Sequence, residues 1–208
     1  MNADYVIAIP VYNGVDLIDV AAPYEIFKWI GAQVYLVAEN QLAVKTGNDL
    51  EITPHKTFDM VPEVDLLWIP GAQSEPLVKQ MQNVNFVRFI QSRSQTAQYV
   101  TSVCTGALLA ADAGLLDGYE ATTHWAFVEQ LKMSYPKVSV RPGHPRFVHD
   151  RNRVTGGGIS SGLDEALYLV KLIAGEEVAE DVQVTMQYFP DPPVAGKIPG
   201  SKRRVLFH

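Results

Sequence analysis

The chain has 208 residues, of which 47% are hydrophobic and 19% are charged, the composition of one compact domain with a sizeable core. Its net charge of −6 and its scattered basic residues argue against nucleic-acid binding. A single cysteine excludes an internal disulfide and any multi-thiol metal centre. The first residues lack a signal-peptide pattern and no apolar run is long enough to cross a membrane, so we expect a cytosolic protein without membrane contacts.

The first half of the chain alternates between short apolar runs, typical of buried parallel strands, and stretches with helical spacing of apolar residues. Strands are predicted at residues 6–9, 34–37 and 64–69. A helix is predicted at residues 21–31, with Pro23 in its first turn or at a kink. A turn is predicted at residues 46–49, and one long or two short helices at residues 76–97, with a break near Asn83.

The second half continues this alternation. Its predicted elements are a strand at residues 99–103, a helix reaching residue 116, a short strand at 121–124, a helix at 125–133, a hairpin at 147–149 and 153–155, and helices beginning at 160 and covering 176–187. From about residue 189 the prolines predict an irregular tail. The alternation predicts a three-layer α/β/α sandwich with a mostly parallel, flavodoxin-like sheet, forming a single domain over residues 1–208.

Cys104 lies at the junction between the strand at residues 99–103 and the helical pattern that follows. A side chain on such a turn, a nucleophile elbow, is lifted clear of the sheet and faces the first free amides of the helix, here those around Thr105 and Gly106. Because these amides and the helix dipole favour an anion, we expect the thiol to ionise more readily than that of a free cysteine. The alternative is that Cys104 is a small core residue.

Three other segments are predicted to reach the same edge of the sheet. Asp19, Gly71 and the three glycines at residues 156–158 each follow a predicted strand. Ligands bind at the carboxyl ends of parallel strands, so we expect one pocket to contain these residues together with Cys104. As alternatives, Asp19 caps a helix and the glycines serve tight turning or close packing. We interpret His124 as a core histidine in preference to a catalytic one.

Two motifs, VTSVCTG at residues 100–106 and ATTHW at residues 121–125, resemble the ThiJ/PfpI superfamily and, within it, the isonitrile hydratases. The likeness covers nearly the whole chain, through LID at residues 17–19, IPG at residues 69–71 and TGGGI at residues 155–159. AraC-type transcription regulators carry a very similar sensor domain joined to a helix-turn-helix domain. From the length of the sequence we expect no such second domain here.

The resemblance implies a homodimer that acts on a small molecule with a cysteine nucleophile, a neighbouring acid and no metal or organic cofactor. On the matching positions the nucleophile is Cys104 and the acid is Asp19. Thr105 stands where protease-like and amidotransferase members have a histidine, so we do not expect the Cys–His dyad of those members. The loop after Ile69 departs from the pattern, since many relatives have a second glycine there.

The activity implied by the resemblance is the addition of water to the terminal carbon of an isonitrile, giving an N-substituted formamide. We expect the Cys104 thiolate to attack this carbon, Asp19 to supply a proton, and a thioimidate to form on sulfur before the Asp19 carboxylate activates water. Amides around the sulfur would stabilise charge, and an apolar pocket would hold the substrate. The expected site residues are Cys104, Asp19 and Thr105 for catalysis, and Gly71, Ala72 and Ile159 for substrate binding.

Two other functions stay open at the level of the sequence. One is a non-enzymatic ligand or redox sensor, in which Cys104 forms a sulfinate held by a protonated Asp19. The other is a glyoxalase or deglycase-like enzyme, because a thiolate also attacks the carbon of reactive carbonyl compounds.

Overall fold

The structure is a computed structural model that describes residues 5–198. Its helices are α1 (Leu17–Trp29), α2 (Ser74–Gln82), α3 (Val84–Ser94), α4 (Gly106–Asp112), α5 (Val128–Ser134), α6 (Ser161–Ala174) and α7 (Glu176–Thr185), with a 3₁₀ turn η1 (Trp125–Phe127) before α5. Seven strands form the main sheet, in the spatial order β10 (Phe147–Asp150), β11 (Arg153–Gly156), β7 (Tyr99–Ser102), β6 (Leu66–Ile69), β1 (Val6–Pro10), β2 (Gln33–Ala38) and β5 (Lys56–Thr57). Two small ladders pair β3 (Val44–Lys45) with β4 (Glu51–Ile52), and β8 (Glu120–Ala121) with β9 (Ser139–Val140).

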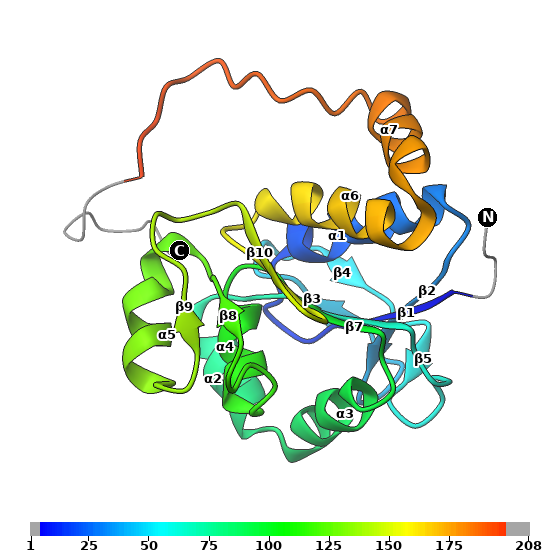
Figure 1. Ribbon diagram of the computed structural model, residues 1–208. Coiled ribbons are helices and arrows are strands. Elements are labelled where there is room, and N and C mark those ends of the chain that lie inside the picture. The colour runs from blue at the N-terminus through cyan, green and yellow to red at the C-terminus, as the bar shows by residue number, and fades with distance from the viewer. Residues whose placement is uncertain (1–4, 199–208) are drawn as a thin grey trace.

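The main sheet is parallel except at one edge, where β10 runs antiparallel to β11. Helices α1 and α6 cover one face of this sheet and α7 packs against α6, while α2, α3 and α4 lie on the other face (Figure 1). The predicted three-layer α/β/α sandwich with a mostly parallel sheet is therefore confirmed. Strands β7, β6 and β1 are neighbours in the middle, so the segments that follow them meet at one edge of the sheet.

Two local predictions are confirmed in detail. The hairpin forms between β10 and β11, with Val148 opposite Thr155. The helical stretch of residues 76–97 breaks at Asn83, which ends α2 and caps α3, since its side-chain oxygen accepts hydrogen bonds from the backbone amides of Asn85 and Phe86.

Two helix boundaries differ from the predictions. Helix α1 begins at Leu17, before the predicted start at residue 21, so Asp19 lies inside its first turn and not in the preceding loop. Helix α4 ends at Asp112 and does not reach residue 116. The reason is Gly114, which adopts a φ of 77° while the following amide donates back to the carbonyl of Ala110 at 2.9 Å, the hydrogen bond of a Schellman-type helix end.

The core contains one carboxylic acid without a hydrogen-bond partner. Glu165 on α6 is 0% exposed, and neither of its carboxyl oxygens has a partner among residues 5–198. Gly156 leaves the space for it, because a Cβ atom at Gly156 would lie 2.2 Å from Glu165 Oε2. Burial, and to a smaller extent the charge of Asp19, raises the pKa of Glu165 well above its ordinary value, so this side chain is held as a neutral acid.

After α7, residues 188–198 form no helix or strand and pass over the α1/α6 side of the molecule in an open arc (Figure 1). The irregular course predicted from about residue 189 is observed as far as residue 198. In the part of the chain that the structure describes, no helix combines the length and the apolar character needed to cross a membrane.

Candidate active site

Cys104 occupies the predicted turn between β7 and α4. Its backbone adopts a φ of 57°, a left-handed conformation that side-chain-bearing residues rarely take. The surrounding structure holds it there: its amide donates to the carbonyl of Gly157 at 2.8 Å, and its carbonyl accepts the Thr123 hydroxyl at 2.8 Å. Gly106 lets the turn approach the sheet, since a Cβ atom there would lie 2.1 Å from the carbonyl oxygen of Ile69.

Two carboxyl groups from the start of α1 face the sulfur. The thiol of Cys104 donates to Asp16 Oδ2 across 3.9 Å. One ligand atom from each of Asp16, Asp19 and Cys104 lies within 4.8 Å of the other two. Sequence analysis identified Asp19 but missed Asp16, although an acid three residues before Asp19 at a helix start is a visible signal.

Gly71, in the loop after β6, holds both acids through its own peptide groups. Its amide donates to Asp19 Oδ2 at 2.9 Å, and its carbonyl accepts the amide of Asp16 at 2.9 Å. Asp19 is 0% exposed and its second oxygen, Oδ1, has no hydrogen-bond partner in the described chain. Asp16 is only half-buried. The two acids therefore lie side by side in different surroundings, one sealed and one open to solvent.

Pro23 fixes the backbone of Asp19 in an indirect way. Proline has no N–H, so within α1 the carbonyl of Asp19 loses the donor that residue 23 would normally supply. The indole Nε1 of Trp68, on β6, donates to this carbonyl instead, at 2.9 Å. Because Trp68 is fully buried, the acid is anchored directly to the core of the sheet.

The predicted ionisation of the Cys104 thiol is opposed by burial of the sulfur. Cys104 is 3% exposed. Burial raises the pKa of the Cys104 thiol well above its ordinary value, and the charges of Asp19 and Asp16 add to the rise. The amides of Ile159 and Thr105 do face the sulfur and act in the opposite direction, but they do not outweigh burial.

Burial and neighbouring groups also shift the pKa values of the two acids, and to different extents. Burial raises the pKa of Asp19 well above its ordinary value, and the charge of Asp16 raises it further. Burial also raises the pKa of Asp16, but the hydrogen bond from the Cys104 thiol opposes that rise. The sealed Asp19 therefore keeps its proton to higher pH than the half-buried Asp16 does.

Thr105 and Ala72 hold the site together. The Thr105 hydroxyl accepts the amide of Ala72 at 2.9 Å and donates to the carbonyl of Ala72 at 2.7 Å. Both polar groups of the Ala72 backbone are thus engaged with Thr105, and the amide of Gly71 is engaged with Asp19. The predicted loop residues are at the site, where these contacts position the acids and the elbow.

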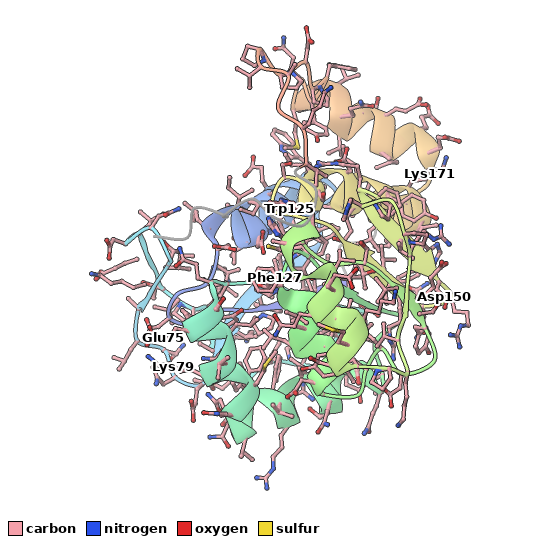
Figure 2. The ribbon with its side chains drawn as sticks, turned by 90° about the vertical axis from the view of Figure 1, so that its left-hand side faces the viewer. Glu75, Lys79, Trp125, Phe127, Asp150 and Lys171 are labelled. Atoms are coloured by element: carbon pink, nitrogen blue, oxygen red, sulfur yellow. The ribbon has the colours of Figure 1, made fainter. Side chains whose placement is uncertain are left out.

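A cavity of about 360 Å³ adjoins the elbow on the side of α6. Its walls include Thr123 and Gly157, which hold the Cys104 backbone, and Ile159, whose side chain is 38% exposed. His124 and Trp125 line it as well; Figure 2 shows Trp125 nearer to α6 than Phe127 is. His124 is not part of the Asp16–Asp19–Cys104 group: its Nδ1 accepts the amide of Ala126, and burial lowers its pKa, so it is neutral.

The triple glycine serves close packing, one of the two alternatives for it. A Cβ atom at Gly158 would lie 2.5 Å from His124 Cδ2, as one at Gly156 would meet Glu165. Among residues 5–198, Asp16, Asp19 and Cys104 are the one group of side chains spaced closely enough to share a metal ion. Since the thiol–Asp16 and Gly71–Asp19 hydrogen bonds already join its members to the protein, we interpret this group as acid–base machinery.

Replacing Gly71 with alanine is expected to disrupt the site. The new Cβ atom would lie 2.6 Å from Thr105 Oγ1, 2.7 Å from the Thr105 amide nitrogen and 3.0 Å from Asp19 Oδ2. We expect unfolding to become easier by about 1–3 kcal/mol, as for other overpacked positions. Chemical denaturation measures this change. Gly196→Ala is the matched control, since a Cβ atom there meets nothing within 4 Å, and an equal effect of both substitutions would contradict the prediction.

A strained cysteine on a strand-to-helix turn, faced by carboxyl groups from the segment after the first strand, defines an α/β protein with a nucleophile elbow. The chain belongs to the DJ-1/PfpI family, which matches residues 6–172. It is 39% identical to isonitrile hydratase from Pseudomonas putida over 181 residues, covering 86% of this chain and 76% of that protein. It is 27% identical to the helix-turn-helix transcriptional regulator GbdR from Pseudomonas aeruginosa, of which it spans 42%. The predicted family is confirmed.

Solved structures agree with this assignment. A ThiJ/PfpI family protein from Pseudomonas syringae superimposes with a TM-score of 0.86 at 35% identity, covering 92% of this chain and 78% of that one. Drosophila melanogaster DJ-1beta superimposes with a TM-score of 0.79 at 18% identity over 88% of this chain and 98% of that one, a similarity of fold alone.

Proposed function

We propose that the protein hydrates isonitriles to N-substituted formamides through a covalent thioimidate on Cys104. The observation that carries the proposal is the arrangement of one thiol and two carboxyl groups within 4.8 Å at the elbow, in a chain 39% identical to an isonitrile hydratase. A second support is the adjoining cavity of about 360 Å³, which has room for the substituent of a small isonitrile.

In the first half of the reaction the Cys104 thiolate bonds through its sulfur to the terminal isonitrile carbon. This carbon already carries a lone pair, which becomes basic once sulfur has bonded, and the sealed, protonated Asp19 donates its proton there, giving a thioimidate, S–CH=N–R. The amides of Ile159 and Thr105, which face the sulfur, stabilise the negative charge on it during attack and departure.

In the second half Asp19, now a carboxylate, takes a proton from water and delivers it to the nitrogen while the hydroxide bonds to carbon. The tetrahedral adduct then loses sulfur, and its hydroxyl proton returns to Asp19. The product is the formamide, R–NH–CHO, and Asp19 ends protonated, as it began. No group outside the described site is required, and we propose that the enzyme works without a cofactor, as a cytosolic homodimer.

The test is the loss of the isonitrile infrared stretch when purified protein is mixed with a small alkyl isonitrile, with the formamide identified by NMR. Asp19→Asn is expected to reduce the turnover number by ~10²–10⁴-fold, since it removes a positioned general acid and base but keeps the shape of the side chain. Asp181→Asn, at an exposed position of α7, serves as the control. Formamide production by Asp19→Asn at the unsubstituted rate would contradict the role of Asp19.

A further inference from the structure

A second cavity lies farther along the same edge of the main sheet. Its volume is about 220 Å³, and it shares no lining residue with the cavity beside the elbow. Three neighbouring parallel strands lead into it, since Val11 follows β1, Ala38 ends β2 and Phe58 follows β5. Ligands of open α/β sheets bind at the carboxyl ends of the strands. The cavity therefore has the position of a binding site, and the reaction proposed above does not use it.

The interior of this cavity is apolar and held in place by packing. Its floor consists of buried side chains, those of Val11, Ala38 and Val44. Two aromatic rings, Tyr12 and Phe58, line it as well. Tyr12 packs edge-on against Phe86 with 5.5 Å between ring centroids, and Phe58 stacks on Phe89 at 4.4 Å. Since both rings are fixed by core neighbours, the walls are preformed, which lowers the entropic cost of binding a ligand.

Glu39 is the one charged side chain among the described residues that line the cavity. Both of its carboxyl oxygens are positioned by amides: Oε2 accepts from Asn83 Nδ2 at 3.2 Å, and Oε1 accepts from Asn85 Nδ2 at 2.6 Å. Glu39 belongs to none of the ion pairs found within residues 5–198. The protein thus orients this negative charge at the cavity without neutralising it.

The ends of two helices add to the negative potential at the cavity. Helix α2 ends there, with Gln80 in its last turn and Asn83 directly after it, and the last carbonyls of a helix carry partial negative charge. Helix α3 begins at the same point, but Asn83 Oδ1 accepts the first free amides of α3, those of Asn85 and Phe86. The positive end of α3 is therefore capped by a side chain of the protein.

These features select one class of ligand. An anion is disfavoured by Glu39 and by the end of α2. A hard metal ion such as Ca²⁺ requires six to eight oxygen ligands, and here the side-chain oxygens of Asn13, Asn40 and Asn83 are already bound to backbone amides. A positive charge joined to a short hydrocarbon chain satisfies both the carboxylate and the apolar floor. Aromatic rings also attract ammonium groups.

We propose that this cavity binds a small organic cation, an ammonium group that carries a short alkyl chain. The ammonium group pairs with Glu39, and the chain lies against Val11, Ala38 and Val44. The site is separate from the elbow and does not depend on the function proposed above. It makes the protein a receptor for amines in addition to any reaction at Cys104.

Calorimetric titration with n-butylammonium at neutral pH tests the proposal without an isonitrile. We expect n-butylammonium to bind at least about fivefold more tightly than butan-1-ol, which has the same chain without the charge. Butyrate, which carries the opposite charge, should give no measurable heat of binding.

Two substitutions locate the site. Glu39→Gln keeps the size of the side chain and is expected to weaken n-butylammonium binding by about fivefold or more. Ala43→Leu, at an exposed position in the wall, should weaken it similarly by filling the cavity while Glu39 keeps its charge. Glu177→Gln, which removes an exposed acid from α7, is the matched control and should bind as the unsubstituted protein does.

Three results would overturn the proposal. The first is no binding of n-butylammonium, or binding no tighter than that of butan-1-ol. The second is equal affinity in Glu39→Gln and Glu177→Gln, which would mean that any exposed acid serves. The third is loss of binding in Glu39→Gln but not in Ala43→Leu, which would place the ligand in the neighbouring groove that Glu39 shares with Arg88. Urea denaturation of each variant confirms that the fold is kept.

Discussion

Cys104→Ala is expected to abolish isonitrile turnover, lowering it by ~10³-fold or more while the protein remains folded. The reason is that Cys104 supplies the sulfur that bonds to carbon in the proposed mechanism, whereas the neighbouring Thr105 hydroxyl is engaged with both polar groups of the Ala72 backbone. Catalytic side chains that act together lose nearly all of their effect on the rate when the nucleophile is removed. Infrared loss of the isonitrile band measures the change, and circular dichroism checks the fold.

The same position permits a second measurement on stability. Cys104 is held at a φ of 57°, where glycine has no steric penalty and alanine has one. Cys104→Gly is therefore expected to be more stable than Cys104→Ala by about 1 kcal/mol, and equally inactive. Urea denaturation of the two variants gives the difference. Residual turnover in either variant would remove Cys104 from the mechanism, whereas equal stabilities would show that the backbone strain is relieved in solution.

Glu165→Gln is expected to stabilise the protein at neutral pH and to have little effect in acid. Glu165 is fully buried without a hydrogen-bond partner in the described chain, and burial raises its pKa. In the unfolded chain an ordinary glutamate ionises near pH 4.3, so folding above that pH must take up a proton. The contribution of the protonated acid to stability is complete below about pH 4.3 and is lost as the pH rises towards the raised pKa of the folded state.

Glutamine has nearly the same shape and does not ionise, so the variant avoids this loss. We expect its free energy of unfolding to exceed that of the unsubstituted protein by about 1–3 kcal/mol at neutral pH, with the gap closing in acid. Urea denaturation at a series of pH values measures the gap. Glu177→Gln removes an exposed acid from α7 and is the matched control. A gap that does not vary with pH would show that Glu165 is ionised in the folded protein.

The sequence predicts the layers of the fold and the place of the nucleophile because both depend on local pattern. The β-branched run before Cys104 and the small residues after it identify a strand and a helix, and the glycine at position 106 allows the close turn between them. Cys104, Asp19 and Gly71 do meet at one edge of the sheet, since all three follow neighbouring strands.

What the sequence could not supply is the direction of side chains and the depth of burial. In the sequence, Asp16 has the position of an ordinary helix-capping residue. Only the structure shows that its side chain makes no capping hydrogen bond and contacts the Cys104 sulfur. The thiol was expected to ionise readily because elbow amides are predictable from local sequence. Burial of the sulfur is not predictable in this way, and it raises the pKa of the thiol. Glu165 has no sequence signal at all, since an acid at a helical position is usually solvated.

The bond between Trp68 and the carbonyl of Asp19 makes the geometry of the reaction depend on residues that never touch a substrate. A substitution beneath the sheet that tilts the indole ring would move the acid relative to the sulfur, whereas changes at the cavity rim would alter which substituents fit. Rate and selectivity can therefore vary separately in this protein, through mutations at different depths.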